Sequence, residues 1–251
     1  MSRDPFGRKL SPSVTPAKSN EPAAWLPDRL LAHWTPNQGV PVCSVVPKGF
    51  ESYTRVFHPA LGPAPNRPVV RWSSVAEWSG CIVHPEMQWE AISTPQGVPR
   101  LAAPWSQEPM HGRCPSDLIA VLCEHLARHT RAVGSVWYAM WRGFPDVRAI
   151  EADGPRFELP DREYVLLHGQ LAAAPDVITS PFPLNAGPSL WWPDDRSWCV
   201  ATEVDYRWTY VAGPEACSTS IERDDRIEAL RTQPQHRGDI DGDRINNALH
   251  A

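Results

Sequence analysis

Lysine is scarce in this sequence, and long apolar runs and an excess of positive charge are missing. Lysine makes up three of the 24 basic residues, and the net charge is −5. Because a nucleic-acid backbone favours a basic partner, this balance predicts no nucleic-acid binding. No segment approaches the roughly eighteen apolar residues of a membrane helix, and residues 1–20 hold no apolar signal segment. We therefore expect a cytoplasmic protein without a membrane partner.

Motifs of familiar cofactor and nucleophile sites are missing as well. The 15 glycines form neither GxGxxG nor a phosphate-binding GxxxxGK loop, so no nucleotide cofactor is expected. No GxSxG motif marks a nucleophilic serine, and no HExxH motif marks a zinc site. The cysteines show no CxxC spacing, which favours free and mostly buried thiols over a disulfide framework. They are Cys43, Cys81, Cys114, Cys123, Cys199 and Cys217.

Short strand-like stretches outnumber helical patterns along the chain. The clearest helix is expected from Ser116 to about Thr130, where apolar residues follow a helical stripe. Together the patterns predict an α+β fold with a single core, built on an antiparallel or mixed sheet of about six to eight short strands with two or three helices. Further helices are expected at 27–34, 73–80 and 214–230, and strands at 40–46, 52–58, 69–72, 133–142, 156–159, 164–168, 197–205 and 208–212.

Composition divides the chain into three parts. Residues 1–21 are rich in serine, proline and charge and are expected to be a disordered N-terminal segment. Residues 22–231 are expected to form a single α+β domain, and residues 232–251 a flexible acidic tail. The proline-rich stretch 95–115 is either a linker or a surface loop that acts as a lid.

Tryptophan is abundant and clustered. The chain has 12 tryptophans, four of them between positions 191 and 208. Since an indole offers a large apolar face and one N–H donor, such a cluster marks either a core or a recognition surface. Carboxylates and arginines between these tryptophans favour a surface where indoles stack on a partner and charged groups orient it. The residues predicted for this surface are Trp191, Trp192, Asp195, Arg196, Glu203, Asp205 and Trp208.

A structural role for the same segment is the alternative. Trp198 alternates with Val200 and Val204, which predicts that Trp198 lies in the core. Trp191 and Trp192 would then cover a sheet edge, with Asp195 and Arg196 in a turn.

Two weaker patterns suggest metal sites. His125 and His129 stand four residues apart on the predicted helix, so both imidazoles share one face, but no third ligand is indicated. The stretch Asp239–Asp243 has carboxylates at the first, third and fifth positions of a calcium loop. This stretch resembles the calcium loop of dockerin repeats, except that Arg244 replaces the turn glycine and His250 the closing carboxylate. We therefore predict no bound metal.

A dispersed catalytic site is a competing prediction. His58 and His84 each precede a proline, which favours positions at a strand end or in a turn, where a histidine can serve as a general base. With Asp195 and Glu203, these histidines would form a hydrolase or transferase site whose convergence one sequence cannot show. A pocket that holds one of the histidines within hydrogen-bond reach of a carboxylate would favour this alternative.

Three stretches carry a family resemblance: GFESYTRVFHPA at 49–60, VWYAMWRGF at 136–144 and LWWPDDRSWCVATEVD at 190–205. With them the chain resembles a family of uncharacterised actinobacterial proteins over roughly residues 25–230. The resemblance implies a cytoplasmic bacterial protein and transfers no catalytic residue. Our primary prediction is a non-catalytic protein that binds another protein or a small-molecule ligand through the tryptophan-rich segment, without a cofactor.

Overall fold

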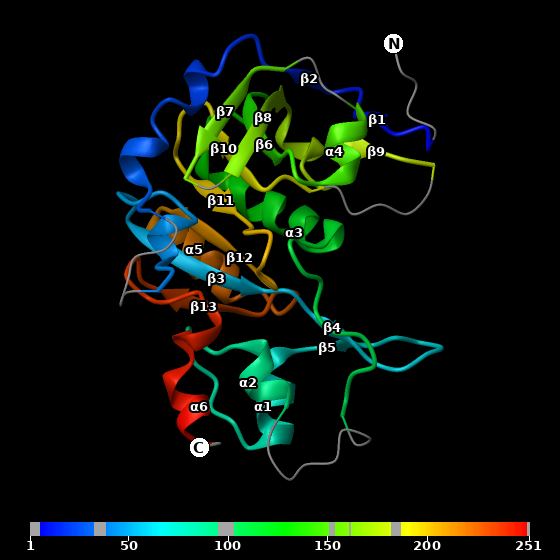
Figure 1. Ribbon diagram of the computed structural model, residues 1–251, viewed down its shortest axis with the longest axis vertical. Helices are drawn as coiled ribbons and strands as arrows, with labels where there is room; N and C mark the ends of the chain where they lie inside the picture. Colours follow the sequence, from blue (N-terminus) through cyan, green and yellow to red (C-terminus); the bar gives the residue numbers. More distant parts are fainter. Residues whose placement is uncertain are drawn as a thin grey trace.

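A nine-stranded sheet forms the centre of the computed structural model, which describes residues 6–32, 39–94, 103–150, 154–160, 162–181 and 187–249. The strands of this sheet are β2 (Val14–Pro16), β3 (Ser52–Phe57), β6 (Val136–Trp141), β7 (Arg156–Leu159), β8 (Arg162–Gly169), β10 (Leu190–Pro193), β11 (Cys199–Ala201), β12 (Trp208–Gly213) and β13 (Ala229–Thr232). Their order is β13-β3-β12-β11-β10-β6-β8-β2 (Figure 1). The strands β7 and β2 pair with successive parts of the same edge of β8, β7 with its first residues and β2 with its last. Every pairing described in this sheet is antiparallel.

Two small strand pairs and six α-helices complete the described chain. The pairs are β1 (Lys9–Leu10) with β9 (Ile178–Thr179), and β4 (Ala60–Leu61) with β5 (Val69–Val70). The helices are α1 (Trp72–Ser79), α2 (Trp89–Ser93), α3 (Ser116–Leu126), α4 (Pro145–Ile150), α5 (Glu215–Glu222) and α6 (Arg244–Leu249). Single 3-10 turns lie at Glu21–Ala23, Pro27–Arg29, Val42–Ser44, Ala127–His129, Leu171–Ala173 and Ile240–Gly242. No helix of the described residues is long and apolar enough to cross a membrane.

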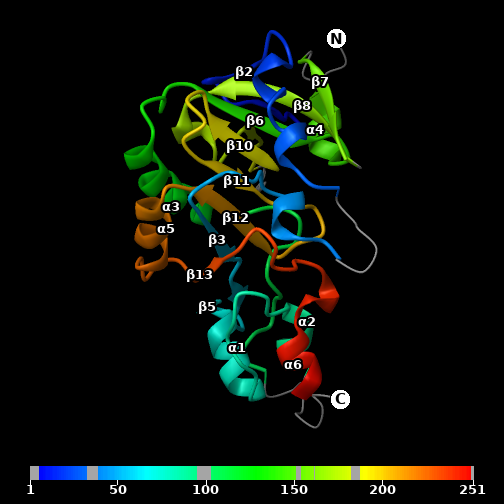
Figure 2. The same ribbon diagram turned by 90° about the vertical axis from the view of Figure 1, so that its left-hand side faces the viewer.

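Both faces of the sheet are covered. Successive strand residues point to opposite faces, and the side chains on each face belong to a separate apolar cluster. On one face α3 and α5 pack over Tyr138, Trp191 and Val200, whereas the N-terminal segment lies on the opposite face (Figure 2). That opposite face carries Trp192 and Trp208, and it is also contacted by α1 and α2, which gather with α6 at one end of the molecule.

The α+β class is confirmed, but the sequence understated the number of elements. Thirteen strands are present among the described residues, in place of about six to eight, and there are six α-helices in place of two or three. The missed strands β1, β2, β4 and β9 span two or three residues each and so are too short to show alternation. β10 and β13, of four residues each, were also missed, whereas β5 lies inside the expected strand 69–72. The apolar core forms two clusters, one on each face of the sheet, where a single core was expected.

Several predicted boundaries are corrected. Within residues 40–46, Val42–Ser44 form a 3-10 turn instead of a strand, because the N–H groups of Ser44 and Val45 donate to the local carbonyls of Pro41 and Val42. The N–H groups of Val42 and Cys43 donate to the distant carbonyls of His236 and Pro234. The helix expected at 27–34 is reduced to a 3-10 turn that ends where Leu30 becomes extended; residues 33–38 lie outside the described part of the chain. The helix expected from 214 to 230 ends at Glu222, and β13 follows it along the edge of β3.

The ends of the chain are tied to the sheet more closely than expected. Near the N-terminus, β2 pairs with β8, and β1 pairs with β9. Near the C-terminus, residues 232–249 contain the end of β13, a 3-10 turn and α6 instead of a loose acidic tail. Of the proline-rich stretch 95–115, residues 95–102 lie outside the described part of the chain. The backbone at 106–107 hydrogen-bonds to Leu61, the last residue of β4.

Asp243 attaches α6 to the rest of the molecule. Its carboxylate is fully buried and accepts hydrogen bonds from His84 Nε2 at 2.8 Å, from the Gln88 N–H at 3.0 Å and from the N–H and side-chain amide of Asn246. Burial by itself would raise the pKa of this carboxyl, but the hydrogen bonds, led by that of His84, outweigh it and lower the pKa.

Acid is therefore expected to destabilise the protein partly through Asp243. Because the folded pKa lies below the unfolded value near 4, the stabilisation is complete above that value and is lost as pH falls through the folded pKa. We expect the unfolding free energy of the wild type to fall more steeply below about pH 5 than that of Asp243→Asn, measured by urea titration at a series of pH values. Parallel slopes for the two proteins would contradict this account.

Candidate functional site

The three tryptophans predicted as stacking platforms are core residues. Trp191, Trp192 and Trp208 are 1%, 0% and 3% exposed, so none offers an indole face to a partner. Since Trp191 and Trp192 are consecutive on β10, they enter opposite faces of the sheet, where Trp191 packs on Trp198 and Trp192 on Trp25. The prediction that these three indoles are exposed stacking platforms is therefore wrong. The expectation that Trp198 lies in the core is confirmed, because its side chain is 0% exposed.

The charged residues of the same segment fall into two separate groups. At one end of β11, Asp195 is exposed and accepts from Thr130, the Arg131 N–H and the Ser197 N–H, while Arg196 lies over the Trp25 ring at 5.4 Å. At the other end, Glu203 is buried and its carboxylate lies 2.7 Å from Arg162 Nη2, which is also 3.3 Å from Asp205. The seven predicted residues therefore do not form one surface.

The residues of the dispersed catalytic prediction are also separate. His58 is fully buried, with Nδ1 2.8 Å from the Met110 carbonyl and Nε2 2.9 Å from the Thr209 hydroxyl. Burial lowers the pKa of His58 to about 4, so it is neutral at pH 7. His84 pairs with Asp243, whereas Asp195 and Glu203 have the partners given above.

Residues of both predicted metal patterns make contacts with other side chains of the protein. His125 hydrogen-bonds to Ser220 and Asp224. In the calcium-like stretch, Asp239 pairs with Arg237 and begins a 3-10 turn, while Asp243 faces His84, so these two carboxylates serve different partners. No group of three or more histidine, cysteine or acidic side chains within the described ranges is arranged to hold a metal ion.

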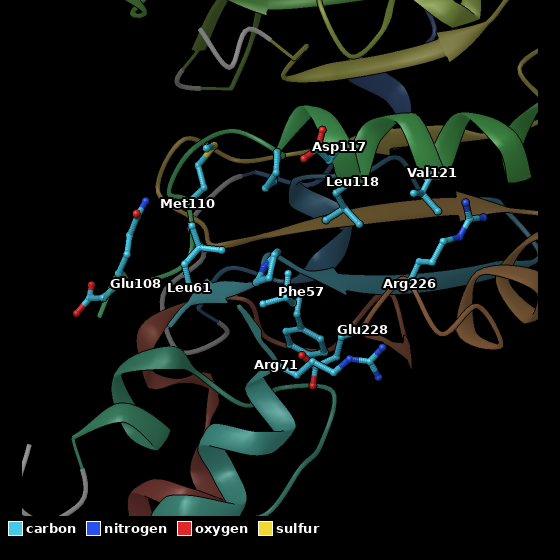
Figure 3. A pocket seen from close by; sticks show the side chains of 14 residues that line it. Phe57, Leu61, Arg71, Glu108, Met110, Asp117, Leu118, Val121, Arg226 and Glu228 are labelled. Atoms are coloured by element: carbon cyan, nitrogen blue, oxygen red, sulfur yellow. The ribbon is translucent and has the colours of Figure 1, made fainter. Parts of the chain in front are cut away.

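A largely apolar pocket lies where α3, the end of β3 and the β4–β5 pair meet (Figure 3). Its cavity volume is about 310 Å³, and eight of its fourteen lining residues are apolar. The roof is formed by Leu118 and Val121 on α3, and the floor includes Phe57 from β3. Two large apolar side chains remain exposed here, Val69 at 65% and Met110 at 37%. Such exposure of apolar groups around a hollow is typical of a binding site.

Of the five charged residues that line this pocket, all except Asp117 have described partners. Arg226 contacts the carboxylates of Glu124 and Asp224, and Glu108 pairs with Arg207. Glu228 accepts from the backbone N–H groups of Trp72 and Ser73 at 2.6 and 2.7 Å and so caps the start of α1. Arg71 donates to the carbonyl of Asp225. The charges therefore shape the rim and hold its elements together.

Sequence reasoning missed this pocket because its walls come from distant parts of the chain. The lining residues fall in three stretches, 57–71, 107–121 and 226–228, with no shared motif. The only signal available in advance was the pair of apolar residues Val69 and Met110, each set among prolines and polar residues.

A second hollow, with a cavity volume of about 610 Å³, lies between the 3-10 turn at Val42–Ser44 and the start of α6. It is more polar, and its lining includes His84, Glu86, Arg237 and Arg244. His84 is thus a pocket histidine within hydrogen-bond reach of a carboxylate, as the catalytic alternative requires. Its Nε2 is, however, used to hold α6 through Asp243, and the carboxylate is not one of those predicted.

Comparison with known protein families, curated proteins and solved structures finds no match to this chain. The resemblance of residues 49–60, 136–144 and 190–205 to an actinobacterial family therefore stays an expectation.

Proposed function

We propose that the protein binds a small, uncharged and predominantly apolar molecule in the pocket beneath α3. The observation that carries the proposal is the apolar lining of a cavity whose volume, about 310 Å³, lies at the lower end of the range for ligand sites. This keeps the predicted role of a binding protein and moves the site from the tryptophan-rich segment to a pocket with accessible apolar groups.

The preference for an uncharged ligand follows from the rim. A charged ligand would lose its hydration on entering an apolar cavity, and this cost is recovered only by pairing with an available opposite charge. Arg226, Glu108 and Glu228 are each engaged by protein partners. The remaining lining carboxylate, Asp117, is exposed, so water screens its attraction for a cationic ligand. An apolar ligand gains instead from covering the side chains of Leu118, Val121 and Met110.

Binding is tested with the neutral fluorescent probe N-phenyl-1-naphthylamine. We expect a saturable rise in fluorescence for the wild type, and at least a tenfold loss of affinity, about 1.4 kcal/mol, for Val121→Trp, because the indole fills the cavity from its α3 wall. Ala120→Trp is the matched control, since Ala120 is the neighbouring α3 residue, is exposed and does not line the pocket.

Equal affinities for the wild type, Val121→Trp and Ala120→Trp would contradict the proposal, because the probe would then bind elsewhere. The anionic probe 1-anilinonaphthalene-8-sulfonate tests the charge preference. We expect weaker binding than for the neutral probe, and stronger binding would overturn the assignment of an uncharged ligand.

A further inference from the structure

Ser220, His125 and Asp224 form a continuous chain of hydrogen bonds where α3 packs against α5. His125 Nδ1 lies 3.0 Å from Ser220 Oγ, and His125 Nε2 lies 2.8 Å from Asp224 Oδ2. His125 is in the last turn of α3, Ser220 is on α5, and Asp224 follows the end of α5. These distances match those between nucleophile, base and orienting carboxylate in serine hydrolases, an arrangement recognised by geometry and not by position in the sequence. The two ring nitrogens have exchanged roles, because Nδ1 faces the serine and Nε2 faces the carboxylate.

The charge state of Asp224 determines which nitrogen of His125 carries the proton. Hydrogen bonds from the Arg226 side chain, the Arg226 N–H and His125 outweigh desolvation and hold the pKa of Asp224 well below its usual range. An ionised Asp224 accepts hydrogen bonds only, so His125 Nε2 must carry a hydrogen. In the neutral imidazole, Nδ1 then presents its lone pair to the Ser220 hydroxyl, as a general base requires.

The hydroxyl hydrogen of Ser220 has two possible acceptors. Its oxygen lies 2.8 Å from the Cys217 carbonyl, so its hydrogen can point either there or toward His125 Nδ1. Ser220 is partly exposed, whereas the side chains of His125 and Asp224 are only 7% and 12% exposed. The base is thus buried, whereas the serine is only partly buried.

We propose that Ser220, His125 and Asp224 form an acyl-transfer site for activated carboxylic esters. Ser220 Oγ attacks the ester carbonyl carbon while its proton moves to His125 Nδ1, and the C–O bond to the alcohol breaks as His125 returns the proton to the leaving oxygen. Water then hydrolyses the acyl-serine by the same proton transfers, which releases the acid and restores Ser220. Asp224 is a positioning residue that holds the imidazole tautomer. This activity is independent of ligand binding beneath α3.

A second serine–histidine pair in the same chain serves as a matched control. Ser135 Oγ lies 2.9 Å from His168 Nε2, nearly the distance found for Ser220 and His125. In the described part of the chain no carboxylate is hydrogen-bonded to His168, whose ring instead packs on Trp137 at 4.4 Å. Ser135 therefore has a histidine neighbour without the orienting acid.

The test is covalent labelling with a fluorophosphonate probe, located by mass spectrometry, together with hydrolysis of 4-nitrophenyl acetate. We expect labelling at Ser220 and not at Ser135, loss of both signals in Ser220→Ala, and unchanged signals in Ser135→Ala. Asp224→Asn is expected to lower the labelling rate by about 10²–10⁴-fold. Asp224→Glu, which keeps a carboxylate, is expected to recover part of the labelling rate that Asp224→Asn loses.

Circular dichroism of each variant separates a chemical effect from unfolding. The proposal is overturned if folded wild type shows neither labelling nor hydrolysis above the buffer rate, because the three residues are then only a link between α3 and α5. Labelling of Ser220 at an unchanged rate in Asp224→Asn, or an equal loss in Asp224→Asn and Asp224→Glu, would overturn the role of Asp224. Equal labelling of Ser135 would show that serine–histidine contact alone suffices, which also contradicts the assignment.

Discussion

Replacing Trp192 with alanine is expected to lower the free energy of unfolding by about 3–5 kcal/mol, as is typical for truncation of a buried aromatic residue. The side chain is 0% exposed and packs edge-on against Trp25 with ring centroids 6.0 Å apart. Alanine removes this contact and leaves a cavity between β10 and the N-terminal segment. Because a domain is stable by only about 5–15 kcal/mol, the loss is a large part of the total. Urea unfolding followed by circular dichroism measures it.

Arg196→Ala is the control for Trp192→Ala, since Arg196 is exposed and only four residues along the chain. We expect it to change the unfolding free energy by no more than about 0.5–1 kcal/mol, the range for an exposed side chain over an aromatic ring. A loss of less than 1 kcal/mol for Trp192→Ala would mean that the indole is not a core group. The tryptophan-rich segment would then again be a candidate for a partner-binding surface.

Removing Asp146 alone is expected to destabilise the protein by about 3–5 kcal/mol, because the buried charge of Arg113 would lose the carboxylate that opposes it. The side chains of Arg113 and Asp146 are 9% and 8% exposed, and Arg113 Nη2 donates to both carboxylate oxygens at 2.7 and 2.9 Å. Burial already lowers the pKa of Arg113, and Asp146 is the charge that opposes this shift. Asp146→Ala removes that compensation, and urea unfolding again gives the loss.

The double replacement Arg113→Met with Asp146→Leu tests the cause of this loss. Apolar side chains of similar volume often substitute for a buried ion pair without cost, so we expect the double variant to be more stable than Asp146→Ala. Arg113 also lies over the Phe144 ring at 3.8 Å, a packing contact that methionine can replace. If the double variant were as unstable as Asp146→Ala, the loss would come from packing around α4 and not from an uncompensated charge.

Elements with a clear periodic pattern were predictable from the sequence. The stripe of Leu118, Ile119, Leu122 and Leu126 defined α3, and the alternation around Trp198 and Val200 defined the antiparallel pairing of β11 with β12. The C-terminal part was not predictable in this way, because α6 is held by the buried carboxylate of Asp243 contacting His84, 159 positions away. A contact between residues so far apart in the chain cannot be predicted from a local sequence pattern.

The candidate sites were less predictable than the fold. The prediction from the tryptophan-rich segment depended on residue type, and residue type does not say whether an indole is covered. The pocket beneath α3 requires the joint placement of three distant stretches, and the Ser220–His125–Asp224 chain requires α3 and α5 to lie side by side. His125 was noted for its spacing from His129, yet its partners are 95 and 99 positions further along the chain.

By itself, the sequence determined the α+β class, the strongest helix and strands, and the burial of Trp198, since these follow from the periods of helices and strands. The tertiary structure decided that Trp191 and Trp192 are both core residues, because helices cover Trp191 on one face of the sheet and the N-terminal segment covers Trp192 on the other. It also decided where accessible apolar and polar groups converge. Burial and convergence depend on which distant segments pack together, and that is set by the total free energy of the folded chain and not by any local stretch.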